Sequence, residues 1–86
     1  MSYRISVKDL ENRIDYLNYL NGFKNVKYDT IGAYFLGGAY GGYCLDQRVN
    51  KYGGVNRLTS YVPRKELYNF INGMIAQLNH KQYIKI

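Results

Sequence analysis

The 86-residue sequence is poor in several residue types, with one cysteine, one histidine, one proline and no tryptophan. One cysteine cannot form an internal disulfide, which is typical of a chain that folds in a reducing compartment. Because a structural zinc site usually takes four Cys or His ligands, such a site is nearly excluded, and no cofactor is expected. No apolar run approaches the roughly 18–20 residues of a membrane span, and the first residues lack the apolar stretch of a signal peptide. We therefore expect a cytoplasmic protein with no membrane partner.

Acidic residues are also scarce, with six Asp and Glu against twelve Lys and Arg, for a net charge of +6. Residues 1–46 hold five groups of each sign, whereas residues 47–86 hold seven basic groups and only Glu66. Clustered Lys and Arg raise the local concentration of anions. The asymmetry predicts an anionic partner, although the same charge would also serve solubility alone.

Two segments are predicted to be helices. The chain is too short to split, so we expect residues 1–86 to form a single domain. Ser6 and Asp9 have the spacing of an N-cap and its acidic partner, which predicts a helix over 6–21. Pro63 suits the start of a second helix over 64–79. Its apolar residues recur at helical spacing, at Leu67, Phe70, Ile71, Met74, Ile75 and Leu78.

Between the helices the apolar period changes to two, which predicts strands. We place them at about 25–29, 31–40 and 43–49, with a loop over 50–62 and a possible edge strand in the tail 80–86. The hairpin turn could fall at Gly41-Gly42 or at Gly37-Gly38, so its register stays open. The order predicts an α+β fold with a two- or three-stranded antiparallel sheet and both helices on one face. The other face would be exposed and would carry tyrosines.

A mixture of glycine, tyrosine and basic residues marks the candidate ligand site. Aromatic rings stack on bases while Lys and Arg neutralise phosphates, so the mixture suits a nucleotide or a nucleic acid. The other interpretation is that several tyrosines are core or interface groups with a polar tip. The candidate residues are Tyr40, Gly41, Gly42, Tyr43, Arg48, Lys51, Tyr52, Arg57, Arg64 and Lys65.

Catalytic chemistry has little support in the sequence. Cys44 and His80 are the available nucleophile–base pair. A buried small residue and a surface histidine explain the two more simply. No pair of carboxylates has a recognisable acid–base spacing, so we do not expect an enzyme.

Three strings resemble those of a group of small phage and prophage proteins: Ala39–Leu45 (AYGGYCL), Val49–Val55 (VNKYGGV) and Pro63–Tyr68 (PRKELY), together with Leu17-Asn18. The resemblance implies a phage accessory protein that acts in the bacterial cytoplasm, with no assigned catalytic residues. Proteins of this kind often counter host defence. Two functions follow: capture of a phosphate-bearing ligand, either a signalling nucleotide or a nucleic acid, or inhibition of a host defence protein in the manner of an anti-CRISPR. In the second, a Tyr/Arg-rich face docks on the host enzyme. A homodimer or higher homo-oligomer is a third possibility.

Overall fold

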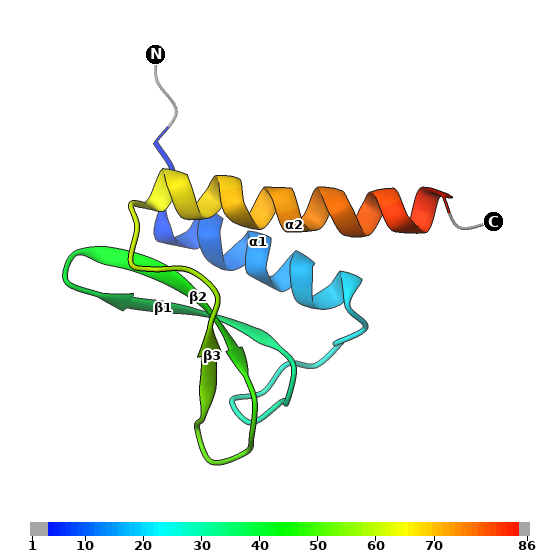
Figure 1. Ribbon diagram of the computed structural model, residues 1–86, viewed down its shortest axis with the longest axis horizontal. Coiled ribbons are helices and arrows are strands. Elements are labelled where there is room, and N and C mark those ends of the chain that lie inside the picture. Colours follow the sequence, from blue (N-terminus) through cyan, green and yellow to red (C-terminus); the bar gives the residue numbers. More distant parts are fainter. Residues whose placement is uncertain (1–3, 85–86) are drawn as a thin grey trace.

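The computed structural model describes the backbone of residues 4–84 and the side chains of residues 4–80. Two helices pack on one face of a three-stranded antiparallel sheet (Figure 1). The elements in chain order are α1 (Val7–Leu20), β1 (Tyr34–Ala39), β2 (Gly42–Arg48), β3 (Val55–Arg57) and α2 (Arg64–Ile84). The helices contact each other and the sheet, which confirms the predicted α+β fold with both helices on one face. In the part of the chain that is described, no helix is long and apolar enough to cross a membrane.

Helix α1 begins where its capping residues predict. The backbone N–H of Asp9 donates to Ser6 Oγ at 3.1 Å, and the backbone N–H of Ser6 donates to Asp9 Oδ2 at 2.8 Å. This reciprocal pair satisfies two N–H groups that the first turn leaves without partners. The helix spans 7–20, one residue inside each end of the predicted range.

The turn that connects β1 and β2 lies at neither of the two predicted positions. Ala39 pairs with Gly42, so the two turn residues are Tyr40 and Gly41. Their φ angles are +55° and +75°, and a type I′ hairpin turn requires positive φ at both central residues. The register also places Leu36 opposite Leu45. Burial of this pair against the helices fixes the turn, because a one-residue slip would move both side chains to the other face.

Three predicted boundaries in the middle of the chain are wrong. Residues 25–29 form no strand, because a tight turn interrupts them: the Lys27 N–H donates to Thr30 Oγ1 at 2.8 Å and the Thr30 N–H to the Lys27 carbonyl at 3.0 Å. The strand predicted over 31–40 begins only at Tyr34. The predicted loop 50–62 contains β3, which pairs with the end of β2, and Val62 forms a bridge with Tyr43. Hydrogen bonding to β2 makes this segment a strand, although its glycines predicted a loop.

The predicted edge strand in the tail 80–86 is also wrong as far as Ile84, since helix α2 continues to that residue. The last two residues lie outside the described part. A helix that is already formed extends cheaply, because each added residue gains one hydrogen bond. The alternation of polar and apolar residues over five positions of the tail favours a strand only weakly, and the hydrogen bonds gained by extending the helix outweigh it.

The core lies between the helices and the sheet. Its buried members come from both helices, from β2 and from the segment that precedes α1: Ile5, Leu10, Ile14, Leu17, Leu45, Leu67, Ile71 and Ile75. The strand positions that face this core are those of one parity, such as Leu36 and Leu45. Within residues 4–84 no helix lies on the opposite side of the sheet (Figure 1), so the strand residues of the other parity form a face that we call the helix-free face.

Candidate functional site

The helix-free face is built from alternate residues of the three strands. Since successive strand residues point to opposite faces, the register assigns this face to Phe35 and Gly37 of β1, Cys44, Asp46 and Arg48 of β2, and Val55 and Arg57 of β3. Tyr61 also lies on this face. Gly42 has the same parity in β2 as Cys44 and Asp46, and the Tyr61 Cβ lies 3.1 Å from the position that a Cβ on Gly42 would take. Two arginines, one carboxylate and one thiol thus share a face on which no helix packs.

Arg48 stands at the centre of the first of two stacks. Its guanidinium carbon lies 4.3 Å from the ring centre of Tyr28 and 5.1 Å from that of Phe35. The residue is only 5% exposed, and its Nε is buried without a hydrogen-bond partner in the described structure. A buried cation without a carboxylate is costly, and the negative faces of two aromatic rings offset part of that cost. We call Phe35, Arg48 and Tyr28 the Arg48 stack.

The Arg48 stack ends in an exposed ring. Tyr28 is 72% exposed, although Arg48 covers part of it. The loop that follows β2 lies beside it, since the Tyr28 hydroxyl is 3.4 Å from the position that a Cβ on Gly53 would take. The ring therefore rests on Arg48 next to this loop, while most of its surface stays in solvent.

Arg57 begins the second stack. Its Nε donates to Asp46 Oδ1 at 3.3 Å, and its guanidinium lies 4.7 Å from the ring centre of Tyr61. Tyr61 in turn meets Tyr40 edge to face, with ring centres 5.9 Å apart and planes at 74°. Tyr40 is 96% exposed, so this group, the Arg57 stack, also ends in an open aromatic ring.

Cys44 lies under the Arg57 stack and is fully buried. Its thiol donates to Asp46 Oδ1 at 3.6 Å. Burial, followed by the neighbouring Asp46 carboxylate, raises the pKa of the Cys44 thiol, which therefore stays protonated near neutral pH. A protonated, covered thiol is a poor nucleophile. Within the described residues no three His, Cys, Asp or Glu side chains gather to hold a metal.

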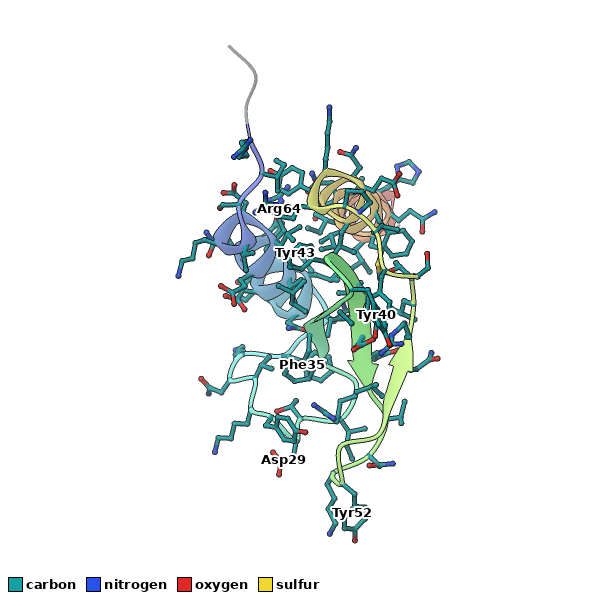
Figure 2. All side chains as sticks on the ribbon, turned by 90° about the vertical axis from the view of Figure 1, so that its left-hand side faces the viewer. Asp29, Phe35, Tyr40, Tyr43, Tyr52 and Arg64 are labelled. Atoms are coloured by element: carbon teal, nitrogen blue, oxygen red, sulfur yellow. The ribbon has the colours of Figure 1, made fainter. Side chains whose placement is uncertain are left out.

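The structure does not bring the residues predicted to bind a ligand together in one place. Arg48 and Arg57 share the helix-free face, and beside it lie Tyr40 and Gly41 of the β1–β2 turn and Gly42 at the start of β2. Lys51 and Tyr52 lie in the β2–β3 connection, with the Lys51 Nζ 5.4 Å from the Tyr52 ring centre. Tyr43 faces the helices and packs against the core, while Arg64 and Lys65 start α2. Figure 2 shows Arg64 with the helices and Tyr52 at the opposite extremity of the molecule.

The residues predicted to bind a ligand leave out four members of the stacks: Tyr28, Phe35, Asp46 and Tyr61. Phe35 carried a usable signal, because it has the opposite parity to Leu36. Tyr61 carried one as well, because it stands among the basic residues of the second half of the sequence. Tyr28 carried none, since it reaches Arg48 from a connecting segment rather than from a strand.

Comparison of the chain with protein-family models, with curated proteins and with solved structures finds no match. The function is therefore argued from the geometry of the helix-free face.

Proposed function

We propose that the chain is a non-enzymatic binding protein that holds a ligand with a base and a phosphate, either a nucleotide or a single-stranded nucleic acid, on its helix-free face. The observation that carries the proposal is the pair of stacks. Each places a guanidinium behind aromatic rings and ends in an exposed tyrosine, Tyr28 in one and Tyr40 in the other.

The Arg48 stack is suited to base stacking because its outermost ring already rests on a guanidinium and has an open side. A base that stacks on the open side of Tyr28 would continue the order Phe35, Arg48, Tyr28. Stacking on an aromatic side chain contributes about 1–3 kcal/mol per base. A ring that is held before binding loses little further conformational entropy, which favours affinity.

Tyr40 supports the same interpretation through its backbone. It has a φ of +55°, a conformation in which Asn, Asp or Gly is ordinarily found at a type I′ turn. A bulky residue held in a sparsely populated conformation is a feature that functional sites show. In this backbone conformation the exposed Tyr40 ring packs against Tyr61, which supports a binding role for the strained position.

Charge supplies the attraction to phosphate. Residues 47–86 carry all of the net charge of +6, and among them Arg57 of the Arg57 stack and Lys51 of the β2–β3 connection remain open to solvent. Asp46 neutralises part of the Arg57 charge, but an ion pair with a half-exposed arginine is weak and can exchange for a phosphate. The resemblance to phage accessory proteins adds a setting: capture of a host signalling nucleotide or nucleic acid in the bacterial cytoplasm.

The test is a titration followed by fluorescence anisotropy, with a labelled oligothymidylate as probe and cyclic dinucleotides as competitors at two salt concentrations. We expect binding that weakens as salt rises, and a steeper slope for the oligonucleotide than for the small nucleotides. Tyr28→Ala and Tyr40→Ala should each weaken binding roughly tenfold.

Tyr19→Ala is the matched control, because Tyr19 is an exposed tyrosine on α1, away from the helix-free face. It should leave the affinity unchanged. Absence of binding by every probe at low salt, or an equal loss in the Tyr19 variant, would contradict the proposal.

A further inference from the structure

Strand β1 forms one border of the sheet. The strand order is β1-β2-β3, so β1 pairs with β2 on one side and has no neighbouring strand on the other within residues 4–84. A free strand edge presents a row of backbone N–H and C=O groups that can pair with another chain.

Asn18 of α1 shows which backbone groups point to that edge. Its side chain, in a residue only 2% exposed, accepts from the Tyr34 N–H at 2.7 Å and donates to the Tyr34 carbonyl at 3.0 Å. The side-chain amide thus makes the two bonds that a neighbouring strand would make. Because these groups alternate along an antiparallel strand, those of Leu36 and Gly38 point to the same free edge.

A groove of about 410 Å³ runs between α1 and this edge. Its apolar lining includes Ile14 of α1, Val26 of the connecting loop and Leu36 of β1. An extended peptide beside β1 would place alternate side chains against this lining, since strand residues alternate between faces.

The charges on the helix side of the groove are mainly acidic. Glu11 and Asp15 are one turn apart on α1, and Lys8 lies one turn before them, so the charged lining has a net charge of −1. The rest of the chain is strongly basic. A peptide with Lys or Arg beside its apolar residues would therefore match this groove better than an acidic one.

We propose that the groove between α1 and β1 binds an extended, basic segment of a partner protein, which adds to the sheet as a fourth strand beside β1. The N–H and C=O groups of Leu36 and Gly38 pair with the backbone of the segment. Its apolar side chains face Ile14 and Leu36, and its cations face Glu11 and Asp15. The groove adjoins the helix-free face, because Phe35 of the Arg48 stack also lines it. The backbone groups of Leu36 and Gly38 take no part in the stacks, so the strand pairing does not depend on the proposed ligand there.

The experiment uses the full chain, labelled with ¹⁵N, and two capped peptides at millimolar concentration: Val-Thr-Lys-Thr-Val-Thr-Lys, in which Val and Lys share one face of the strand, and its counterpart with Glu in place of Lys. In the free chain the amides of Leu36 and Gly38 should exchange with solvent faster than those of Phe35 and Gly37, which face β2. The basic peptide should shift and protect the Leu36 and Gly38 amides. Absence of shifts at these two amides would overturn the proposal.

Two versions of the basic peptide, N-methylated at alternate residues in opposite phase, test the backbone pairing itself. One version should bind and the other should fail, because a strand at an edge uses the N–H groups of one side only. Equal behaviour of the two versions would contradict strand addition.

Charge is tested by Glu11→Lys with Asp15→Lys, against Asp29→Lys as the matched control outside the groove. The double variant should bind the basic peptide roughly tenfold more weakly and the acidic peptide more strongly. The control should change neither. Concentration-dependent dimerisation that protects Leu36 and Gly38 without any peptide would instead identify a second copy as the occupant and overturn the partner proposal.

Discussion

The two faces of the sheet are organised by different forces. The face toward the helices carries apolar side chains such as Leu36 and Leu45, and hydrophobic burial holds it. The opposite face carries Arg48, Asp46 and Arg57, which are held by rings and by one ion pair. Burial of apolar area is the dominant favourable term in folding, whereas a half-exposed ion pair adds little. We therefore expect the residues that stabilise the fold to be largely different from the residues that form the candidate site.

The largest expected effect comes from the core face. Leu45 is fully buried at the centre of β2, and Leu45→Ala would leave a cavity between the sheet and both helices. We expect a loss of about 2–5 kcal/mol in the free energy of unfolding, measured by urea denaturation. Val55→Ala on the helix-free face is the control and should cost less than about 1 kcal/mol. Similar losses in the two variants would show that the faces are not separable.

A second change locates the part of the helix-free face that is closely packed. A Cβ on Gly37 would lie 2.7 Å from both Cys44 Sγ and Asp46 Oδ2, so those groups would have to move. Gly37→Ala should therefore destabilise the fold by about 1–3 kcal/mol in the same urea experiment. Gly73→Ala in α2 is the matched control, because no described atom outside its own helix lies within 4 Å of the added Cβ. The control should gain about 0.5–1 kcal/mol through helix propensity, and a gain in the Gly37 variant would contradict the packing argument.

The third change separates binding from stability at Arg48. Removing a buried cation without a carboxylate relieves a desolvation cost, whereas the two ring contacts are lost. Because these contributions oppose each other, Arg48→Met should change the free energy of unfolding by no more than about 1 kcal/mol. The same variant should bind the oligonucleotide more weakly, since the Tyr28 ring is no longer fixed. A loss of stability as large as that of Leu45→Ala would mean that Arg48 belongs to the core instead.

The two faces also differ in how far the sequence predicts them. The helices and the α+β fold follow from local signals, such as the Ser6–Asp9 cap and the apolar spacing after Pro63. The hairpin turn does not, because its position depends on which residue of β1 meets Leu45 across the sheet. The stacks are harder still, since Tyr28 contacts an arginine twenty positions later in the chain. Contacts of that kind have no fixed spacing, so Arg48 and Arg57 could be predicted as candidates while the contact of Tyr28 with Arg48 could not.

The smallest effect is expected at the turn, and it runs in the opposite direction. Tyr40 occupies a left-handed position that Asn tolerates better, and Tyr40→Asn would create the Asn-Gly pair that type I′ turns favour. The fold should therefore gain about 0.5–1 kcal/mol, offset in part by the lost edge-to-face contact with Tyr61. Oligonucleotide binding should weaken at the same time, because the exposed ring of the Arg57 stack is gone. A variant that is more stable and binds less well would show that the Tyr40 ring serves binding, although Asn would give a more stable turn. A variant that is less stable would show that the Tyr61 contact, rather than the backbone strain, decides the energetics of the turn.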